Sequence, residues 1–190
     1  MSIILASASP RRKELLEMLG VKDMKIIPAK GEEAVPEGLA PGPMVELLAL
    51  QKAREVRQLC SEEDIVIAAD TIVWHNERVY GKPHSTEQAR QMLESLSGDC
   101  HRVYTGVAII VGERETVSHE ESRVCFRPLS RQEIDRYIAT GEPMDKAGAY
   151  GAQGIGALFV REIQGDFFNV MGLPLCRLGL MLKEQGVELL

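Results

Sequence analysis

Apolar side chains recur at helical spacing in several separate stretches of the chain. Two of these stretches open with a capping-box pattern, Ser85-x-x-Gln88 and Ser130-x-x-Glu133, and a third opens at Pro10. Glycines follow several of the expected helix ends, where they suit a left-handed cap. The pattern predicts helices over about Pro10 to Leu19 (inward face Leu15, Leu16, Met18 and Leu19), Met44 to Leu59, Ser85 toward Gly98, Ser130 to Gly141, and from Leu173-Pro174 onward.

Other stretches follow the two-residue period of β-strands or are continuously apolar. The run Ile65 to Ala69 predicts a strand buried on both faces, with Asp70 and Thr71 at its carboxyl end. Further strands are expected at Ile3–Leu5, in a hairpin of 72–74 with 78–80, in a long antiparallel pair of 101–111 with 116–126, and at 158–163. Strands and helices alternate throughout, which indicates an α/β or α+β fold around a central mixed sheet.

A length of 190 residues suits one domain spanning the whole chain, 1–190. Hydrophobic residues make up 45% of the chain, but no apolar run is long enough to cross a bilayer and no signal peptide precedes the first strand. We therefore expect a cytoplasmic protein with no membrane partner. Cys60, Cys100, Cys125 and Cys176 form no C-x-x-C pair, which argues against a zinc site and predicts reduced thiols.

A formal net charge of -6 disfavours broad binding to nucleic acid, which usually needs a basic surface. Local clusters of cations in such a chain suit a small anionic ligand better. The clearest cluster opens the first helix, where Ser9 can cap, Pro10 fits the first turn, and Arg11, Arg12 and Lys13 follow. Cations oppose the helix dipole there, so they indicate a bound phosphate. The alternative is that each simply extends into water.

Lys52 falls inside the apolar stripe of the helix expected over 44–59. Its ammonium either turns outward to solvent or contacts a phosphate at the inner edge of a cleft. Asp70, at the expected end of a buried strand, is placed to bind a divalent cation, to activate water, or only to cap the next turn. Glu32 and Glu33 are adjacent acids, and either both are solvated or one of them completes that metal site with Asp70. Lys82 adds a cation on the Gly81–Pro83 turn.

The chain lacks a P-loop motif, an H-E-x-x-H helix and a G-x-S-x-G elbow, so the chemistries that depend on them lose support. Metal-assisted attack of water on a polyphosphate fits the residues that remain. Scattered Arg and Lys side chains would neutralise the phosphates, and a carboxylate would hold the cation.

Several motifs, taken in order, resemble those of the Maf family of nucleoside triphosphate pyrophosphatases, over essentially the whole chain. They are Leu5-Ala6-Ser7-x-Ser9-Pro10-Arg11-Arg12, Ala69-Asp70-Thr71-Ile72-Val73, Gly81-Lys82-Pro83, Leu96-Ser97-Gly98, Asp145-Lys146-Ala147-Gly148-Ala149-Tyr150-Gly151-x-Gln153-Gly154 and Gly172-Leu173-Pro174-Leu175. The resemblance implies an elongated two-lobed α/β fold, with a mixed twisted central sheet flanked by helices and a central cleft, similar to the inosine triphosphate pyrophosphatases.

The resemblance also implies hydrolysis between the α- and β-phosphates with a divalent cation, Mg²⁺ or Mn²⁺, and a nucleoside triphosphate as substrate. Asp70 would accept the proton of the attacking water and bind metal together with Glu33. Arg12, Thr71 and Gln153 match positions associated with base selection, and Ser7, Lys52 and Lys82 would line the phosphate region. A homodimer is one alternative for the assembly, which the sequence leaves open.

Within the family, the loop with Gln153 resembles the branch that acts on dTTP and UTP, a house-cleaning activity. Ala152 departs from the bulkier aliphatic residue common there, which could loosen the pocket. The Gln153 amide can donate and accept, so it can match the O4 and N3–H edge of uracil or thymine. The alternatives are the 7-methyl-GTP branch of the family and a nucleotide-binding regulator of septum formation that does not hydrolyse its ligand.

Overall fold

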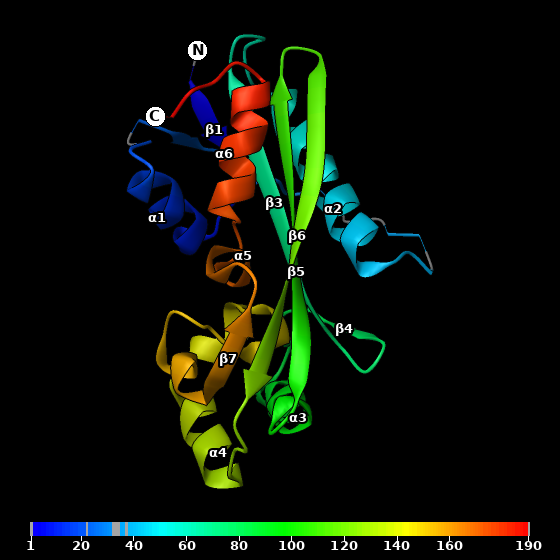
Figure 1. Cartoon of the computed structure of the whole chain (residues 1–190), viewed down its shortest axis with the longest axis vertical. Helices are drawn as coiled ribbons and strands as arrows, with labels where there is room; N and C mark the ends of the chain where they lie inside the picture. The colour runs from blue at the N-terminus through cyan, green and yellow to red at the C-terminus, as the bar shows by residue number, and fades with distance from the viewer. Residues whose placement is uncertain (1, 22, 32–34, 37, 190) are drawn as a thin grey trace. The chain divides into compact units, whose positions relative to one another are not determined.

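The computed structural model describes residues 2–21, 23–31, 35–36 and 38–189. Its helices and strands alternate along the chain (Figure 1). In order they are β1 (Ile3–Leu5), α1 (Pro10–Met18), β2 (Lys25–Ile26), α2 (Pro41–Arg57), β3 (Ile65–His75), β4 (Arg78–Tyr80), α3 (Thr86–Leu96), β5 (Cys100–Val111), β6 (Arg114–Phe126), α4 (Arg131–Ala139), β7 (Val160–Gln164), α5 (Phe167–Met171) and α6 (Leu175–Glu184).

The strands form a mixed sheet in the order β2-β1-β3-β5-β6-β7, with β4 paired to the end of β3. β1 runs parallel to β2 and β3, whereas β3 with β4 and β6 with β7 are antiparallel. A two-residue turn at Gly112 and Glu113 joins β5 to β6. The prediction of an α/β fold with a mixed sheet flanked by helices is confirmed.

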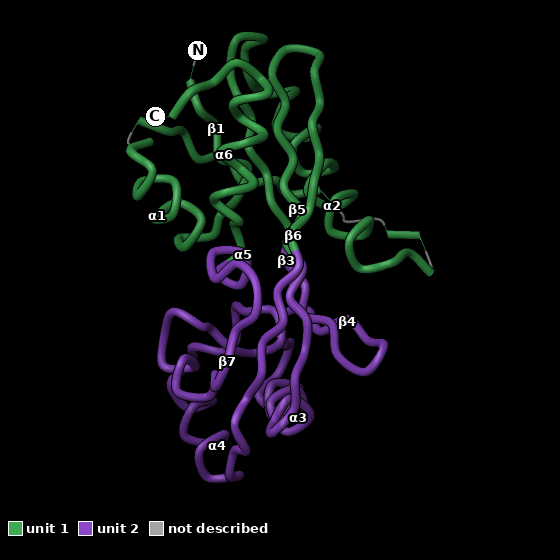
Figure 2. Tube along the Cα trace, in the orientation of Figure 1, with its two compact units in different colours: residues 1–70, 105–120, 172–190 green, residues 71–104, 121–171 purple. Residues whose placement is uncertain are grey.

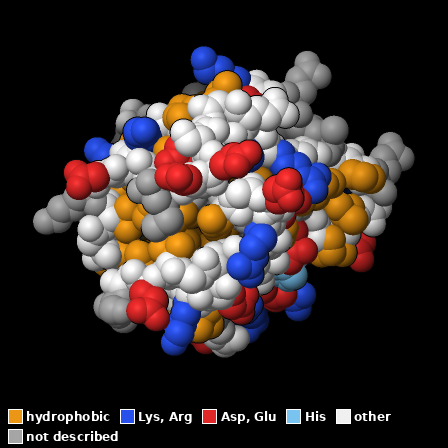
Figure 3. Space-filling model, turned by 90° about the horizontal axis from the view of Figure 1, so that it is seen from above, with side chains coloured by type: hydrophobic (Ala, Val, Ile, Leu, Met, Phe, Trp, Pro, Cys, Tyr) orange, Lys and Arg blue, Asp and Glu red, His pale blue; other side chains and the backbone are white. Residues whose placement is uncertain are grey.

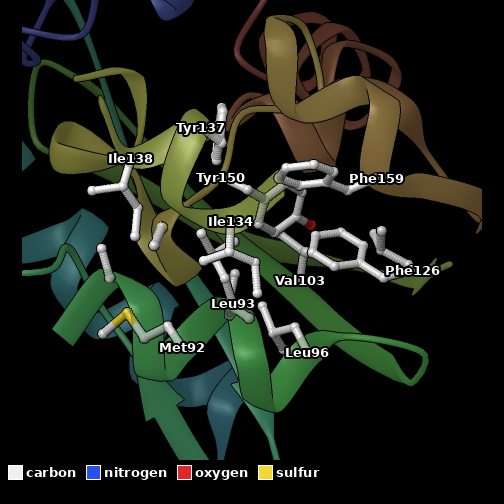
Figure 4. Close-up of a cluster of buried hydrophobic side chains, with 14 residues drawn as sticks. Met92, Leu93, Leu96, Val103, Phe126, Ile134, Tyr137, Ile138, Tyr150 and Phe159 are labelled. Atoms are coloured by element: carbon white, nitrogen blue, oxygen red, sulfur yellow. The ribbon is translucent and has the colours of Figure 1, made fainter. Parts of the chain in front are cut away.

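The chain divides into two compact units (Figure 2). Unit 1 contains residues 1–70, 105–120 and 172–190, and unit 2 contains residues 71–104 and 121–171. In unit 1, α2 lies on one side of the strands, and α1 and α6 lie on the other (Figure 1). In unit 2, α3 and α4 pack against an aromatic core that includes Phe126, Tyr137, Tyr150 and Phe159 (Figure 4).

The helix predictions hold except for one inward-facing residue and one helix start. Met18 is 62% exposed, so only Leu15 and Leu16 are the buried leucines of α1. The second exception is at the start of α2, which begins at Pro41, before the expected Met44, because prolines fit the first turn of a helix. The capping box of Ser130 and Glu133 is present as predicted.

The expectation of four reduced cysteines is wrong for one pair. Cys100 and Cys125 lie on the neighbouring strands β5 and β6 with their Cα atoms 4.0 Å apart, and they form a disulfide. Strand pairing brings these thiols together across 25 residues of sequence. Cys60 and Cys176 are free thiols. In the described part of the chain, no helix has the length and apolarity that a membrane span requires.

Candidate active site

The unit 1 site starts from the alternation of side chains along β3. Val66 and Ala68 face α2 and pack in one buried cluster with Ala49 and Ala53 of that helix. Because side chains two residues apart share a face of a strand, Asp70 points to the same side. Small residues on both elements bring the helix close to the sheet, so the helix side chain level with Asp70 must meet it.

That helix side chain is Lys52, whose Nζ forms a hydrogen-bonded ion pair with Oδ1 of Asp70. The side chains are 19% and 13% exposed, so both charges are largely withdrawn from water. A charge pair so placed offsets part of the desolvation of each partner. Of the two alternatives for Lys52, the outward turn to solvent is therefore wrong.

Asp70 does not end its strand as predicted. β3 continues without interruption to His75, because its second half pairs with β4 in the register Val73↔Tyr80. The apolar run stops at Asp70, but the backbone ladder does not. Asp70 is thus held by hydrogen-bonded strand on both sides, which fixes its backbone more firmly than a strand terminus would.

Ser7 and Arg12 meet just after β1. Arg12 Nη1 donates to Ser7 Oγ at 3.0 Å, and its Nε donates to the carbonyl of Gly172 at 2.8 Å. Ser7 is 8% exposed. The parallel register of β1 with β3, Leu5↔Ile67, places Ser7 alongside the stretch of β3 that leads to Asp70. Unit 1 therefore contains two pairs of predicted site residues, Ser7 with Arg12 and Lys52 with Asp70.

Lys13 of α1 makes a contact of another kind. Lys13 forms an exposed i,i+4 ion pair with Glu17 at 3.4 Å, the ordinary surface arrangement. Ser9 is the N-cap residue as expected, but its side chain makes no capping hydrogen bond. Its backbone N–H instead donates to Ser7 Oγ at 3.2 Å, so Ser7 organises this turn.

The predicted metal ligands are Asp70 and Glu33, and Glu33 lies outside the described residues. Among the residues that the structure describes, no group of three His, Cys, Asp or Glu side chains could hold a metal by itself. The donor at Asp70 still fits Mg²⁺, which often takes one or two carboxylates and completes its shell with substrate phosphates and water. The carboxylate suits a cation that arrives with a triphosphate better than a resident one.

Thr71, Lys82 and Gln153 belong to unit 2. Thr71 follows Asp70 directly on β3, and Lys82 is exposed on the turn after β4. Within unit 2 this turn is joined to the glycine-rich loop of residues 141–156, because the carbonyl of Gly81 accepts a hydrogen bond from the N–H of Gly148 at 3.1 Å. Two separate sequence motifs thus form one substructure.

The backbone of the glycine-rich loop is sharply turned at Gly148 and Ala149, which have φ of 68° and 60°. An alanine in that region is strained, and such strain persists only where the surroundings impose it. They do so here, since Ala149 is fully buried and the next residue, Tyr150, shares a 2.7 Å hydrogen bond with His101 Nε2. Beyond this anchor the chain emerges at Gln153, which is exposed.

Sequence reasoning missed two residues that shape these sites. Gly106 on β5 lets the backbone of α2 approach, and an isolated glycine in a strand pattern was a usable signal. Glu142 binds the backbone of the glycine-rich loop, and no sequence pattern marked it. On the face shown in Figure 3, acidic and basic side chains are interspersed rather than segregated into a basic patch.

A family model described as Maf-like protein matches residues 2–185. A "dTTP/UTP pyrophosphatase" of Bacillus cereus is 49% identical over 186 residues, which cover 98% of this chain and 96% of the relative. The chain belongs to the Maf family. A Bacillus anthracis relative of the same name is 48% identical over the same shares of the two chains.

Solved structures with low sequence identity share the fold of this chain. The Ham1 protein of Staphylococcus aureus matches with a TM-score of 0.56 at 14% identity, over 97% of this chain and all of that chain (100%). A HAM1 protein from Coxiella burnetii matches with a TM-score of 0.53 at 20% identity, over 97% and 99%. At such identities these likenesses concern the fold alone.

Proposed function

We propose that this Maf protein is a nucleoside triphosphate pyrophosphatase that hydrolyses dTTP and UTP to the nucleoside monophosphate and pyrophosphate. The substrate class is supported by the names of relatives 48–49% identical over nearly the whole chain. The observation that carries the chemistry is the Lys52–Asp70 pair, a carboxylate held beside a cation in a largely buried position.

In the proposed reaction, Asp70 is the general base and accepts a proton from water. The water oxygen forms a bond to the α-phosphorus, the bond from that phosphorus to the bridging oxygen breaks, and pyrophosphate leaves with the electron pair. Lys52 exchanges its contact with Asp70 for a phosphate oxygen, which frees the carboxylate for the water. Ser7, Arg12 and Lys82 provide further donors for phosphate oxygens or the base.

A divalent cation, Mg²⁺ or Mn²⁺, completes the proposal. When bound, it would neutralise phosphate charge and polarise the phosphoryl oxygens. Asp70 would hold it, and Glu33 is proposed as a second ligand. Base selection is assigned to Arg12, Thr71 and Gln153. A cytoplasmic place of action is part of the same proposal, because the substrates are the nucleotides of that compartment.

The test is an Asp70→Asn variant assayed with dTTP, UTP, CTP and 7-methyl-GTP, with Mg²⁺ and then Mn²⁺. Pyrophosphate and orthophosphate are measured separately, which identifies the bond that is cleaved. Loss of a general base predicts a fall in kcat of about 100-fold or more with the fold intact. Asp64→Asn is the matched control, since Asp64 is a buried acid of unit 1 whose carboxylate accepts hydrogen bonds from the backbone N–H groups of Ser2 and Ser61.

Undiminished turnover by Asp70→Asn would remove Asp70 from the mechanism. Nucleotide binding with no pyrophosphate release by the wild-type protein, in either metal, would favour the regulatory alternative. Preference for 7-methyl-GTP over dTTP and UTP would move the chain to the other branch of the family.

A further inference from the structure

Glu142 lies at the start of the glycine-rich loop, and the proposed function gives it no role. Its Oε2 accepts a hydrogen bond from the N–H of Ile155 at 2.9 Å, and its Oε1 accepts one from the N–H of Gly156 at 3.1 Å. The hydroxyl of Tyr137 also donates to Oε1, at 2.9 Å. One carboxylate therefore ties the start of the loop to its far end.

Tyr137 extends this network to a third point of the loop. Its hydroxyl oxygen accepts a hydrogen bond from the N–H of Gly151 at 3.1 Å. The tyrosine itself is 2% exposed and its ring packs against that of Phe159 with centroids 4.9 Å apart. Figure 4 shows Tyr137 and Phe159 in the same cluster. The loop is thus fastened, through Glu142 and Tyr137, to the rigid core of unit 2.

The glycines of the loop are required by these contacts. A Cβ at Gly154 would lie 2.5 Å from Glu142 Oε1, and a Cβ at Gly156 would lie 2.7 Å from the Tyr137 hydroxyl oxygen. Such distances are closer than real side chains approach, so only glycine lets the backbone come near enough. The spacing of the glycines follows the position of one carboxylate and one hydroxyl.

The ionisation state of Glu142 also favours its hydrogen bonds to the loop. Burial alone would raise the pKa of Glu142, but the hydrogen bonds from the loop backbone and from Tyr137 outweigh it, so its pKa lies below the ordinary value. The residue is therefore an ionised acceptor at neutral pH, and charge-assisted hydrogen bonds are the stronger kind.

We propose that Glu142 is a positioning residue for base selection, which acts by fixing the backbone on both sides of Gln153. The fixed points at Gly151, Ile155 and Gly156 flank Gln153 closely in sequence. An amide side chain that can turn over would read cytosine as readily as uracil, since the two bases present reversed donors and acceptors. Discrimination requires the amide to be held. This inference rests on the proposed function.

The test is Glu142→Gln, which replaces one accepting oxygen by an NH₂ group facing backbone donors. The measured quantity is the ratio of kcat/KM for UTP to that for CTP. We expect the ratio to fall about tenfold, the effect of losing one hydrogen bond to a charged group. Turnover of CTP should change little, because steps that do not depend on the base are untouched.

The matched control is Glu133→Gln in the capping box of α4. Glu133 is also a carboxylate of unit 2 that accepts a backbone N–H, that of Ser130, and a side-chain donor, Arg127. Its loss should lower stability comparably and leave the UTP/CTP ratio unchanged. Tyr137→Phe removes the link to Gly151 with little change in volume and should also lower the ratio. If Glu142→Gln does not fold, the UTP/CTP ratio of Tyr137→Phe tests the positioning role in its place.

A parallel decline of UTP and CTP turnover in the Glu142 variant, like that of the control, would show a purely structural role and overturn the inference. Binding of α,β-methylene UTP and CTP is measured alongside. If wild-type protein prefers the UTP analogue but releases no pyrophosphate, the proposed function fails and the binding ratio decides the role of Glu142. If wild-type protein prefers neither base by either measure, the inference is overturned.

Discussion

Replacing Gly106 by alanine should disturb both the stability and the activity of this protein. Gly106 lies on β5 beneath the first turns of α2. A Cβ there would lie 2.1 Å from the carbonyl oxygen of Val45, 2.3 Å from its carbonyl carbon and 2.7 Å from the backbone nitrogen of Glu46. All three atoms are helix backbone, so no side chain can turn aside, and the helix itself has to move.

The size of the movement follows from these distances. Ordinary van der Waals contact begins at 3.4 Å, so α2 must withdraw by about 1 Å, an overpacking that typically costs about 1–3 kcal/mol. The same helix carries Lys52, whose ammonium would shift relative to Asp70. Because a displacement of about 1 Å can cost about 100-fold in rate, kcat/KM for dTTP should fall by roughly that factor.

Urea unfolding followed by circular dichroism measures the change in the free energy of unfolding. Pyrophosphate release at a temperature where the variant is folded measures the change in kcat/KM for dTTP. Gly179→Ala is the control, because Gly179 lies within α6 and its new methyl group would meet no other heavy atom of the described residues within 4 Å, apart from the adjoining backbone of the helix. That change should raise the free energy of unfolding by about 0.5–1 kcal/mol and leave activity unaltered.

Wild-type stability and activity in Gly106→Ala would refute the close backbone contact of α2 with β5. Lower stability with full activity would refute only the inference that the position of α2 on the sheet determines the position of Lys52.

Three further predictions concern single side chains. Burial lowers the pKa of His101 from 6.5 to about 3. As the pH falls below 6.5, this histidine therefore binds a proton in the unfolded chain before it does so in the folded one. The free energy of unfolding should fall by about 2 kcal/mol between pH 7 and pH 5. Urea melts at the two pH values should show this slope, and His101→Phe should flatten it. Lys52→Met should reduce kcat/KM for dTTP at least about tenfold with a smaller effect on thermal unfolding; equal activity at all substrate concentrations would count against a phosphate contact. Gly148→Ala combines a φ of 68° with a Cβ 2.8 Å from the side chain of Val73, so it should destabilise by about 2 kcal/mol or more, and an unchanged melting temperature would contradict this.

Local chemistry was sufficient to predict much of this structure. Hydrophobic periodicity located the buried faces of α2, α3, α4 and α6, because the buried face of a helix is the one on which its apolar side chains recur. The capping box at Ser130 is a contact between residues three apart, so the sequence contains both partners. The ordered motifs also indicated the family, which the comparisons confirm.

The sequence by itself placed Lys52 in an apolar stripe and Asp70 after a buried run, and it left open whether they meet. The tertiary structure decided that, because the contact needs α2 packed closely against β3 through small residues on both elements. It likewise decided that β3 continues past Asp70, that Cys100 reaches Cys125, and that Glu142 holds Ile155. The continuation of β3 follows from the local hairpin with β4, but the other two contacts join residues that only the folded chain brings together. Their free energy belongs to the assembled fold, so no local pattern in the chain marks them.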